Sequence, residues 1–221
     1  MIKPNPKVTV IVTAYNEELF IGRCMRSLLS QKFPWVDYEI VVVDDGSTDR
    51  TPYALELFRE DVVLIRNETT LGLPASLNKA IKKVRSPYLV RVDADDYVSR
   101  NFLNFLFTFI QQNPYMHAVS CDYNLVNDEG DVIERKNCMD EPIACGIIFK
   151  TADILDVGMY DENFRLHEER DLRIRFLQKF NIHRLELPLY RYRKHEGNST
   201  NDSEAMAFHM DQLKSKHGID D

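Results

Sequence analysis

Several signals are missing from this 221-residue sequence, and each absence excludes a class of protein. No apolar run approaches the ~18 residues that a membrane span needs, and Lys3 and Pro4 stand where a signal peptide would have its apolar stretch. The cysteines lack the paired spacing of zinc and redox motifs, so we expect free thiols in a reducing compartment. The sequence therefore predicts a cytoplasmic protein, with at most a peripheral contact at the inner face of the membrane.

An excess of positive charge is missing as well. The chain has 28 lysines and arginines against 35 aspartates and glutamates, a formal net charge of −7. Surfaces that bind the nucleic-acid backbone are strongly basic, so we expect no nucleic-acid partner. An anionic ligand would have to be held locally, by a metal ion or by a few placed basic side chains.

The sequence also lacks linkers and the common nucleotide motifs. It has no internal repeat, no low-complexity tract and no Gly/Ser-rich linker, which favours a single domain. The GxxxxGK[ST] and GxGxxG patterns are absent, so the usual cradles for a nucleoside triphosphate and for a dinucleotide are excluded.

What the first half contains is an alternation of short β-branched runs with helical patterns. We expect strands at residues 7–15, 38–47, 62–67 and 87–96 and helices at 16–31, 51–60 and 73–84. Asn16 and Thr51 are the expected caps of the first two helices. Such an alternation is typical of βαβ units around a parallel sheet.

The second half is less regular. Strands are expected at 117–126, 131–136, 143–150 and 182–193, and helices at 100–114 and 169–180. In the first of these helices the expected apolar face consists of Phe102, Phe105, Leu106 and Phe109. In the tail, residues 203–218 carry a modest stripe of Met206, Met210 and Leu213, which we expect to pack on the domain or on a partner, such as a second copy in a homodimer.

Acidic residues follow three of the predicted strands. Glu17 follows the first strand, Asp44 and Asp45 lie at the end of the second, and Asp93 and Asp95 lie at the end of the fourth. In an open parallel sheet the carboxyl ends of the strands share one edge, where ligands bind, so these clusters should converge there. An Asp-x-Asp pair places two hard oxygen ligands on one side of an extended chain, which suits Mg²⁺ or Mn²⁺ together with a diphosphate.

The stretches "VTVIVTAYNEE", "IVVVDDGSTD", "VRVDADDYV", "GMYDENFRLHEERDL" and "YRKHEGNST", in this order, resemble the glycosyltransferase family two proteins, inverting enzymes with the GT-A fold. The resemblance runs from about Lys7 to about Thr200. It implies an α/β fold with a Rossmann-like, doubly wound mixed sheet, helices on both faces and a single domain. The domain would span 1–200, with a nucleotide-binding half to about 97 and an acceptor and catalytic half from about 98, followed by a helical tail at 201–221.

The resemblance also implies roles for individual residues. Residues matching the family's nucleotide-sugar-binding positions are Thr13, Ala14, Tyr15, Glu17, Asp45, Asn78, Asp93, Arg193 and His195. Asp45 would read the edge of the base, Asp95 would be the metal ligand with Asp96 sharing that role, and the cofactor would be Mn²⁺ or Mg²⁺. Arg193 and His195, with Ser199 nearby, would close over the diphosphate.

Glu169 matches the family's general base. Glutamate replaces the usual aspartate there, which leaves Glu168 and Asp171 open as alternative bases. In the third helix Asn78 matches the family pattern, but Leu77 stands where an arginine usually precedes it.

The resemblance predicts an inverting, metal-dependent glycosyltransferase. Its donor would be a nucleotide-diphosphate sugar, with a UDP-sugar as first choice, and its acceptor a saccharide or lipid-linked saccharide in the synthesis of cell-surface polysaccharide or lipopolysaccharide. Two alternatives remain open. A sugar nucleotidyltransferase would share the sheet, acid pair and metal, but usually has a basic loop after the first strand, and "TAYNEE" has no basic residue. A non-catalytic nucleotide-sugar-binding module is opposed only by Glu169.

Overall fold

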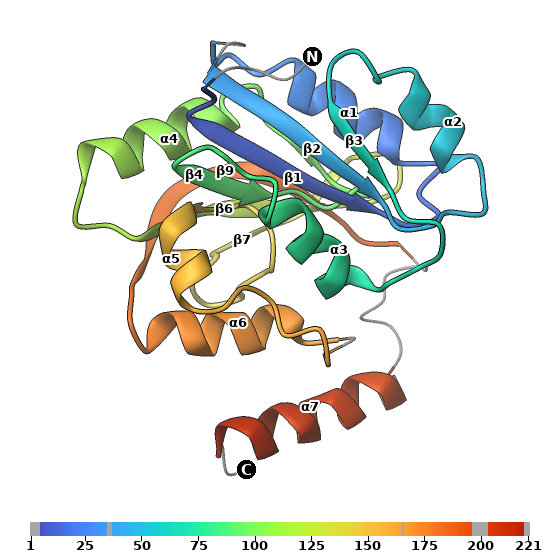
Figure 1. Cartoon of the computed structure of the whole chain (residues 1–221). Helices are drawn as coiled ribbons and strands as arrows, with labels where there is room; N and C mark the ends of the chain where they lie inside the picture. Colours follow the sequence, from blue (N-terminus) through green and yellow to red (C-terminus); the bar gives the residue numbers. More distant parts are fainter. Residues whose placement is uncertain (1–4, 35–36, 165, 196–202, 219–221) are drawn as a thin grey trace.

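The first half of the chain folds as the predicted series of alternating strands and helices (Figure 1). The computed structural model describes residues 5–34, 37–164, 166–195 and 203–218, so Ser199 lies outside the described residues. In chain order the elements of this half are β1 (Val8–Ala14), α1 (Ile21–Leu29), β2 (Tyr38–Asp44), α2 (Thr51–Glu56), β3 (Val63–Arg66), α3 (Leu73–Ile81) and β4 (Tyr88–Arg91).

The second half extends the sheet and adds further helices. Its elements are β5 (Tyr97–Val98), α4 (Phe102–Gln112), β6 (Ala118–Val126), β7 (Val132–Lys136), β8 (Ile147–Lys150), α5 (Thr151–Asp156), α6 (Glu168–Leu177), β9 (Ile182–Arg193) and α7 (Ser203–His217). The short elements α5 and β5 were not expected from the sequence, because six and two residues are too few to show a hydrophobic period.

The strands of the described residues form one mixed sheet in the order β3-β2-β1-β4-β8-β6-β9-β5, with β7 paired to β6. Strands β1 to β4 are mutually parallel where they pair, whereas β8 is antiparallel to both β4 and β6. The strand order reverses direction between β1 and β4. In sheets of this kind that switch point opens a crevice beyond the carboxyl ends of the strands.

Helices cover both faces of the sheet, as predicted (Figure 1). Alternate residues of β1 point to opposite faces: Val10 packs in the core that includes α1 and α4, and Ile11 packs in the core that includes α3 and α6. The α1 positions predicted to face the core, Ile21, Cys24, Met25 and Leu28, are fully buried. The apolar spacing of this helix therefore positions it on the sheet.

Three local predictions were wrong. Asn16 does not cap α1, which begins after Phe20; Asn16 adopts φ 57° and its side-chain oxygen accepts the backbone N–H of Thr48 at 2.8 Å. Thr51 is the first helical residue of α2 rather than its cap.

The third wrong prediction concerns the buried face of α4. This face consists of Phe102, Leu103, Leu106, Phe107 and Ile110, and Phe105 is 40% exposed. Because seven of the eleven residues of α4 are apolar and they spread over more than half of its circumference, its sequence alone does not fix which side faces the sheet.

Helix α7 is attached to α6 by an ion pair from Lys216 and a hydrogen bond from His217. The Asp171 carboxylate, which is fully buried, lies 2.6 Å from Lys216 Nζ and 2.8 Å from His217 Nε2. Leu213 of the predicted apolar stripe is buried, so the tail packs on the domain. Among the described residues no helix combines the length and the apolar character that a membrane crossing requires.

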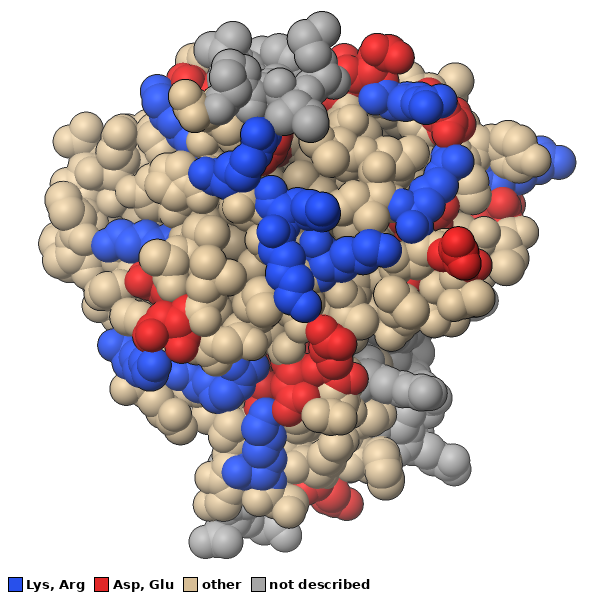
Figure 2. Space-filling model, in the orientation of Figure 1, with Lys and Arg blue, Asp and Glu red and all other residues tan. Residues whose placement is uncertain are grey.

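Charged side chains gather in clusters on the face of the molecule that is turned toward the viewer in Figure 1. Figure 2 shows lysine and arginine side chains gathered over the middle of this face and a cluster of acidic side chains below them. The net negative charge of the chain therefore does not spread evenly over its surface.

Asp122 joins three strands of the second half. It is fully buried on β6, and its carboxylate accepts hydrogen bonds of 2.8 Å from Arg184 on β9 and Arg135 on β7. Burial alone would raise the pKa of Asp122, but the hydrogen bonds from the two arginines and from the backbone of Cys138 lower it to about 2.

We predict that Asp122→Asn lowers the free energy of unfolding by about 1–3 kcal/mol at pH 7, since hydrogen bonds to a charged group are lost. The folded-state pKa lies below the unfolded value of about 3.9, so this stabilisation is present above about pH 4 and is lost as the pH falls toward 2. Urea denaturation of both proteins at pH 7 and pH 3 tests this. An equal difference at both pH values would contradict it.

Candidate active site

The crevice at the switch point is a cavity of about 370 Å³. It is lined by Thr13, Ala14, Tyr15, Glu17, Asp45, Thr70, Gly72, Leu73, Arg91, Asp93, Ala94, Asp95 and Tyr192. The segments after β1, β2 and β4 thus meet at one edge of the sheet, as the distribution of acids in the sequence predicts. Tyr15 is 48% exposed at this cavity.

Carboxylates are crowded in this cavity. Burial, followed by the charges of Asp95, Asp93 and Asp49, raises the pKa of Glu17 to about 8. Burial and the neighbouring charge of Asp93 likewise raise the pKa of Asp95. The group of Glu17, Asp93 and Asp95 is therefore short of positive charge, and its oxygen donors are of the kind that a hard divalent cation prefers.

Arg91 supplies part of the missing charge. This buried side chain donates from Nε to Asp93 Oδ1 at 2.6 Å and from one terminal nitrogen to Glu168 Oε1 at 3.1 Å. It therefore links the strand β4 to the start of α6. The sequence analysis did not single out Arg91, although a charged residue two positions before Asp93 in an otherwise apolar strand points to the same side as that acid and could have indicated the pair.

Asp96 differs from its two neighbours. It does not line the cavity and is 1% exposed; its carboxylate accepts the hydroxyl of Tyr190 and the backbone N–H of Arg193, both at 2.7 Å. Ligand atoms of Asp93, Asp96 and Cys145 do lie within 4.8 Å of one another. Burial raises the pKa of the Cys145 thiol well above its usual range, however, and a protonated sulfur does not suit Mg²⁺ or Mn²⁺.

The predicted sharing of a metal by Asp96 is therefore not supported by this arrangement. Asp96 ties β9 to the end of β4 instead. Of the three aspartates, Asp93 and Asp95 face the cavity, where a cation could also reach a phosphate.

Asp45 lines the cavity but already has a full set of partners. Its two oxygens accept hydrogen bonds from five donors: Asn67 Nδ2, Ser76 Oγ, Thr70 Oγ1, Leu71 N and Gly72 N. A carboxylate offers about four lone-pair sites, so this one has no spare acceptor for the edge of a base. Asp45 instead fixes the 67–72 loop and the start of α3, which form one wall of the cavity.

Gly46 is required beside it. This residue has φ +75°, and a Cβ there would lie 2.7 Å from the backbone of Thr69. The close approach of the 45–47 turn to the same loop explains the glycine in "DDGS".

The remaining predicted donor-binding residues lie around the cavity rather than in its lining. Asn78 is buried on α3, where its side-chain amide forms hydrogen bonds with the backbone of Tyr160 and the side chain of Glu162. This amide therefore has no free group for the predicted contact with the sugar donor.

Two residues at the end of β9 and just beyond it contact the Asp95 segment. His195 Nε2 lies 3.1 Å from Asp95 Oδ2. Arg193 is buried and donates to the backbone oxygens of Asp95 and Asp128, so it braces the Asp95 segment.

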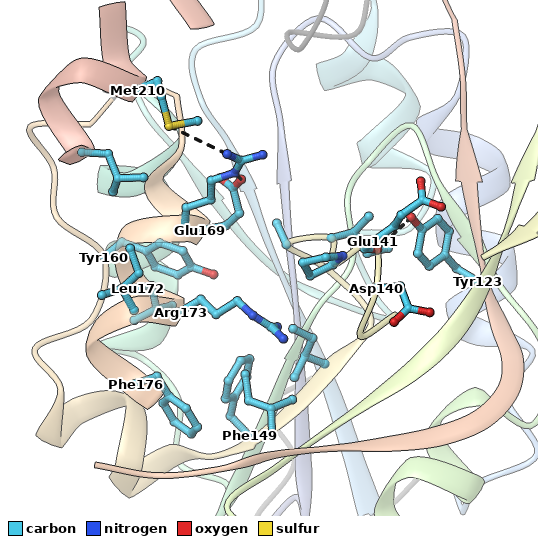
Figure 3. A pocket seen from close by; sticks show the side chains of 18 of the residues that line it. Tyr123, Asp140, Glu141, Phe149, Tyr160, Glu169, Leu172, Arg173, Phe176 and Met210 are labelled. Atoms are coloured by element: carbon cyan, nitrogen blue, oxygen red, sulfur yellow. Dashed lines mark hydrogen bonds and ion pairs between the residues drawn. The ribbon is translucent and has the colours of Figure 1, made fainter. Parts of the chain in front are cut away.

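Glu169 lies in a second, larger cavity of about 710 Å³ (Figure 3). This cavity is bounded by α6, by the 140–147 segment and by α7. The Glu169 side chain is 31% exposed, and its nearest ion-pair partner is Arg170, 4.0 Å away. Glu168, by contrast, is committed to Arg91, and Asp171 to Arg175 and α7.

The sequence matches the family model described as Glycosyl transferase family 2 over residues 9–183. It is 37% identical over 111 residues to a poly(ribitol-phosphate) beta-glucosyltransferase of Bacillus spizizenii, and the matched region covers 48% of this chain and 18% of that protein. It is 31% identical over 155 residues to an uncharacterized glycosyltransferase of Haemophilus influenzae, and here the matched region covers 67% of this chain and 43% of that protein. The chain thus spans less than half the length of these relatives.

Solved structures have the same fold. TarS 1-349 of S. aureus in complex with UDP-GlcNAc superposes with a TM-score of 0.76 at 25% identity, covering 94% of this chain and 66% of that one. The mannosyltransferase PcManGT of Pyrobaculum calidifontis, in complex with GDP-Man and Mn²⁺, gives 0.77 at 21% identity, covering 98% and 65%. These likenesses confirm the predicted GT-A fold. Together with the family model, they lead to one conclusion: this chain belongs to glycosyl transferase family 2.

Proposed function

We propose that this chain transfers a sugar from a nucleotide-diphosphate donor to a hydroxyl acceptor, with inversion, during the assembly of a cell-surface polymer. One arrangement carries the proposal. The acid-lined cavity at the switch point and the cavity that contains Glu169 are linked through the Arg91 ion pairs to Asp93 and Glu168. Donor and acceptor sites side by side are what glycosyl transfer requires.

The donor binds in the cavity at the switch point, in the half of the chain up to about residue 97. Thr13, Ala14 and the exposed ring of Tyr15 form the wall after β1 on which a base and ribose can pack. A UDP-sugar remains the first choice, and the complexes of TarS with UDP-GlcNAc and of PcManGT with GDP-Man support a nucleotide sugar in general.

Asp93 and Asp95 would hold a divalent cation, Mn²⁺ or Mg²⁺, with Glu17 beside them. When bound, such a cation supplies positive charge to the diphosphate that leaves. His195, hydrogen-bonded to Asp95, orients that carboxylate, and its ring packs on Phe20 at 4.8 Å between centroids. Arg193 keeps the Asp95 segment in place by donating a hydrogen bond to the backbone oxygen of Asp95.

Glu169 acts as the general base. Its carboxylate is accessible from the acceptor side, whereas Glu168 and Asp171 are buried in ion pairs that a proton transfer would disrupt. By removing the proton of the acceptor hydroxyl, Glu169 makes the oxygen a better nucleophile. Attack from the side opposite the departing diphosphate inverts the anomeric centre.

For the donor site we predict that UDP binds at least about tenfold more weakly to Asp95→Asn than to the unaltered chain when Mn²⁺ is present, since a charged metal ligand is removed. Isothermal titration calorimetry with Mn²⁺, and again with EDTA, measures this. Asp37→Asn, at the opposite end of β2, is the matched control and should bind UDP normally. Equal affinities of the Asp95 and Asp37 variants would exclude Asp95 as a ligand.

For the base we predict that Glu169→Gln lowers kcat by roughly 10²- to 10⁴-fold, the usual contribution of a general base. The donor affinity should stay within about twofold, because Glu169 lies outside the donor cavity. Release of UDP from UDP-GlcNAc, with Glu186→Gln as the surface control, is the assay. Unchanged turnover of the Glu169 variant would remove Glu169 from the mechanism, whereas no release of UDP by the unaltered chain would favour a non-catalytic binding module.

A further inference from the structure

The cavity beside Glu169 is mainly apolar. Its deeper wall is formed by Phe149 of β8 and by Leu172 and Phe176 of α6, and Ile143 and Leu213 close it from the 140–147 segment and from α7. A cavity with such walls favours a ligand that carries hydrocarbon, because burying that surface removes it from water.

Arg173 extends from α6 into the middle of this cavity (Figure 3). Its guanidinium forms no hydrogen bond or ion pair with any residue that the structure describes. Burial lowers the pKa of the Arg173 guanidinium, and a negative charge on Cys138 would oppose this shift. Burial also raises the pKa of the Cys138 thiol, however, so Cys138 stays neutral and supplies no counter-charge. A half-buried guanidinium without an anion is unfavourable, which indicates that an anion belongs to the ligand.

The acids around the cavity do not fill this role. Asp140 accepts a hydrogen bond from Asn137, and Glu141 lies 2.9 Å from Lys136. Both come from the segment that faces α6 (Figure 3). Glu169, on the same helix as Arg173, is the residue that we assign to proton transfer.

Three chemically different side chains follow one another along one face of α6. Glu169, Arg173 and Phe176 stand at positions i, i+4 and i+7, so they lie on the same side of the helix, and all three line the cavity. Figure 3 shows them in this order, with Glu169 at one end and Phe176 beside Phe149 at the other. The order is a carboxylate that can take a proton, a cation, and an aromatic wall.

We propose that this face of α6 is the acceptor site, and that it takes an acceptor in which the attacked hydroxyl, a phosphate and a hydrocarbon chain follow one another. Arg173 binds the phosphate, and Phe149 and Phe176 pack on the chain beyond it. A saccharide joined through phosphate to a prenyl chain has this chemistry. The assignment rests on the proposed function only in taking Glu169 as the base.

Binding of farnesyl phosphate to the full chain, below its critical micelle concentration, tests the site. The reporter is the ¹³C-methyl signal of Met210, which lines the cavity, with the buried core residue Met25 as the reference that should not move. Farnesyl phosphate should shift Met210 saturably. Farnesol, which lacks the phosphate, and ribitol 5-phosphate, which lacks the chain, should each bind about tenfold or more weakly.

Variants assign the phosphate to Arg173. Arg173→Gln should weaken farnesyl phosphate about tenfold or more and leave farnesol unchanged, while Arg173→Lys should retain part of the affinity. Arg59→Gln, an exposed arginine near α2, is the matched control and should bind both compounds normally. A merely structural role for Arg173 would weaken both compounds together and would overturn the proposal.

Two further results would contradict the proposal. Equal binding of ribitol 5-phosphate and farnesyl phosphate would rule out the hydrocarbon part, and an unmoved Met210 signal would rule out the site. Titration with UDP and Mn²⁺ tests the donor cavity separately. A chain that binds farnesyl phosphate through Arg173 but no nucleotide would contradict the proposed function and not the anion site.

Discussion

The site depends on one buried arginine held between two carboxylates. Arg91 lies on β4 with Asp93 on one side and Glu168 on the other. Burial opposes its charge, but Asp93, Tyr160 and Glu168 raise its pKa well above the usual range, so the guanidinium stays charged. Removing one partner from such a buried group typically costs about 3–5 kcal/mol, because the remaining charge is then buried without a counter-charge. Through it the acid-lined cavity and the start of α6 keep a fixed relation.

The order of the strands leads the chain from this edge of the sheet to the start of α6. The parallel strands β1, β2 and β4 bring their terminal acids to one edge, and the antiparallel strand β8 then adds to β4 and leads into α5 and α6. Glu168, the first residue of α6, is tied to Arg91, and its neighbour Glu169 faces the other cavity. One helix start therefore serves both as an anchor and as the candidate site of proton transfer.

Much of the fold could be predicted from the sequence. The β-branched runs and the Ile21, Cys24, Met25 and Leu28 spacing locate the first strands and helix correctly, because burial on both faces of a parallel sheet leaves a clear apolar record. The buried face of α4 could not be predicted, since its seven apolar residues spread over more than half of the helix circumference. The short helix α5 could not be predicted from the sequence, because six residues are too few to show the periodic spacing of apolar residues that marks a helix.

The site was only partly predictable for a different reason. Motifs report which residue types lie near a strand end. The cavity therefore contains the predicted residues Thr13, Ala14, Tyr15, Glu17, Asp93 and Asp95. They do not report how many hydrogen bonds a carboxylate already accepts, and this is what separates Asp95 from Asp45 and Asp96. The role of Arg91 depends on Glu168, a partner from a distant segment of the chain. The role of Arg173 depends on its having no partner among the described residues, which only the fold reveals.

The central claim is that the acids beside Arg91 form a metal and diphosphate site next to the cavity that contains Glu169. A crystal structure of the full chain grown with UDP and Mn²⁺, with the metal located by its anomalous scattering, tests it most directly. The account predicts an anomalous peak within bonding distance of Asp95 and of a UDP phosphate oxygen, in the cavity beyond the carboxyl ends of β1 and β4. A nucleotide bound in the cavity beside Phe176, or a metal that does not touch Asp93 or Asp95, would contradict it.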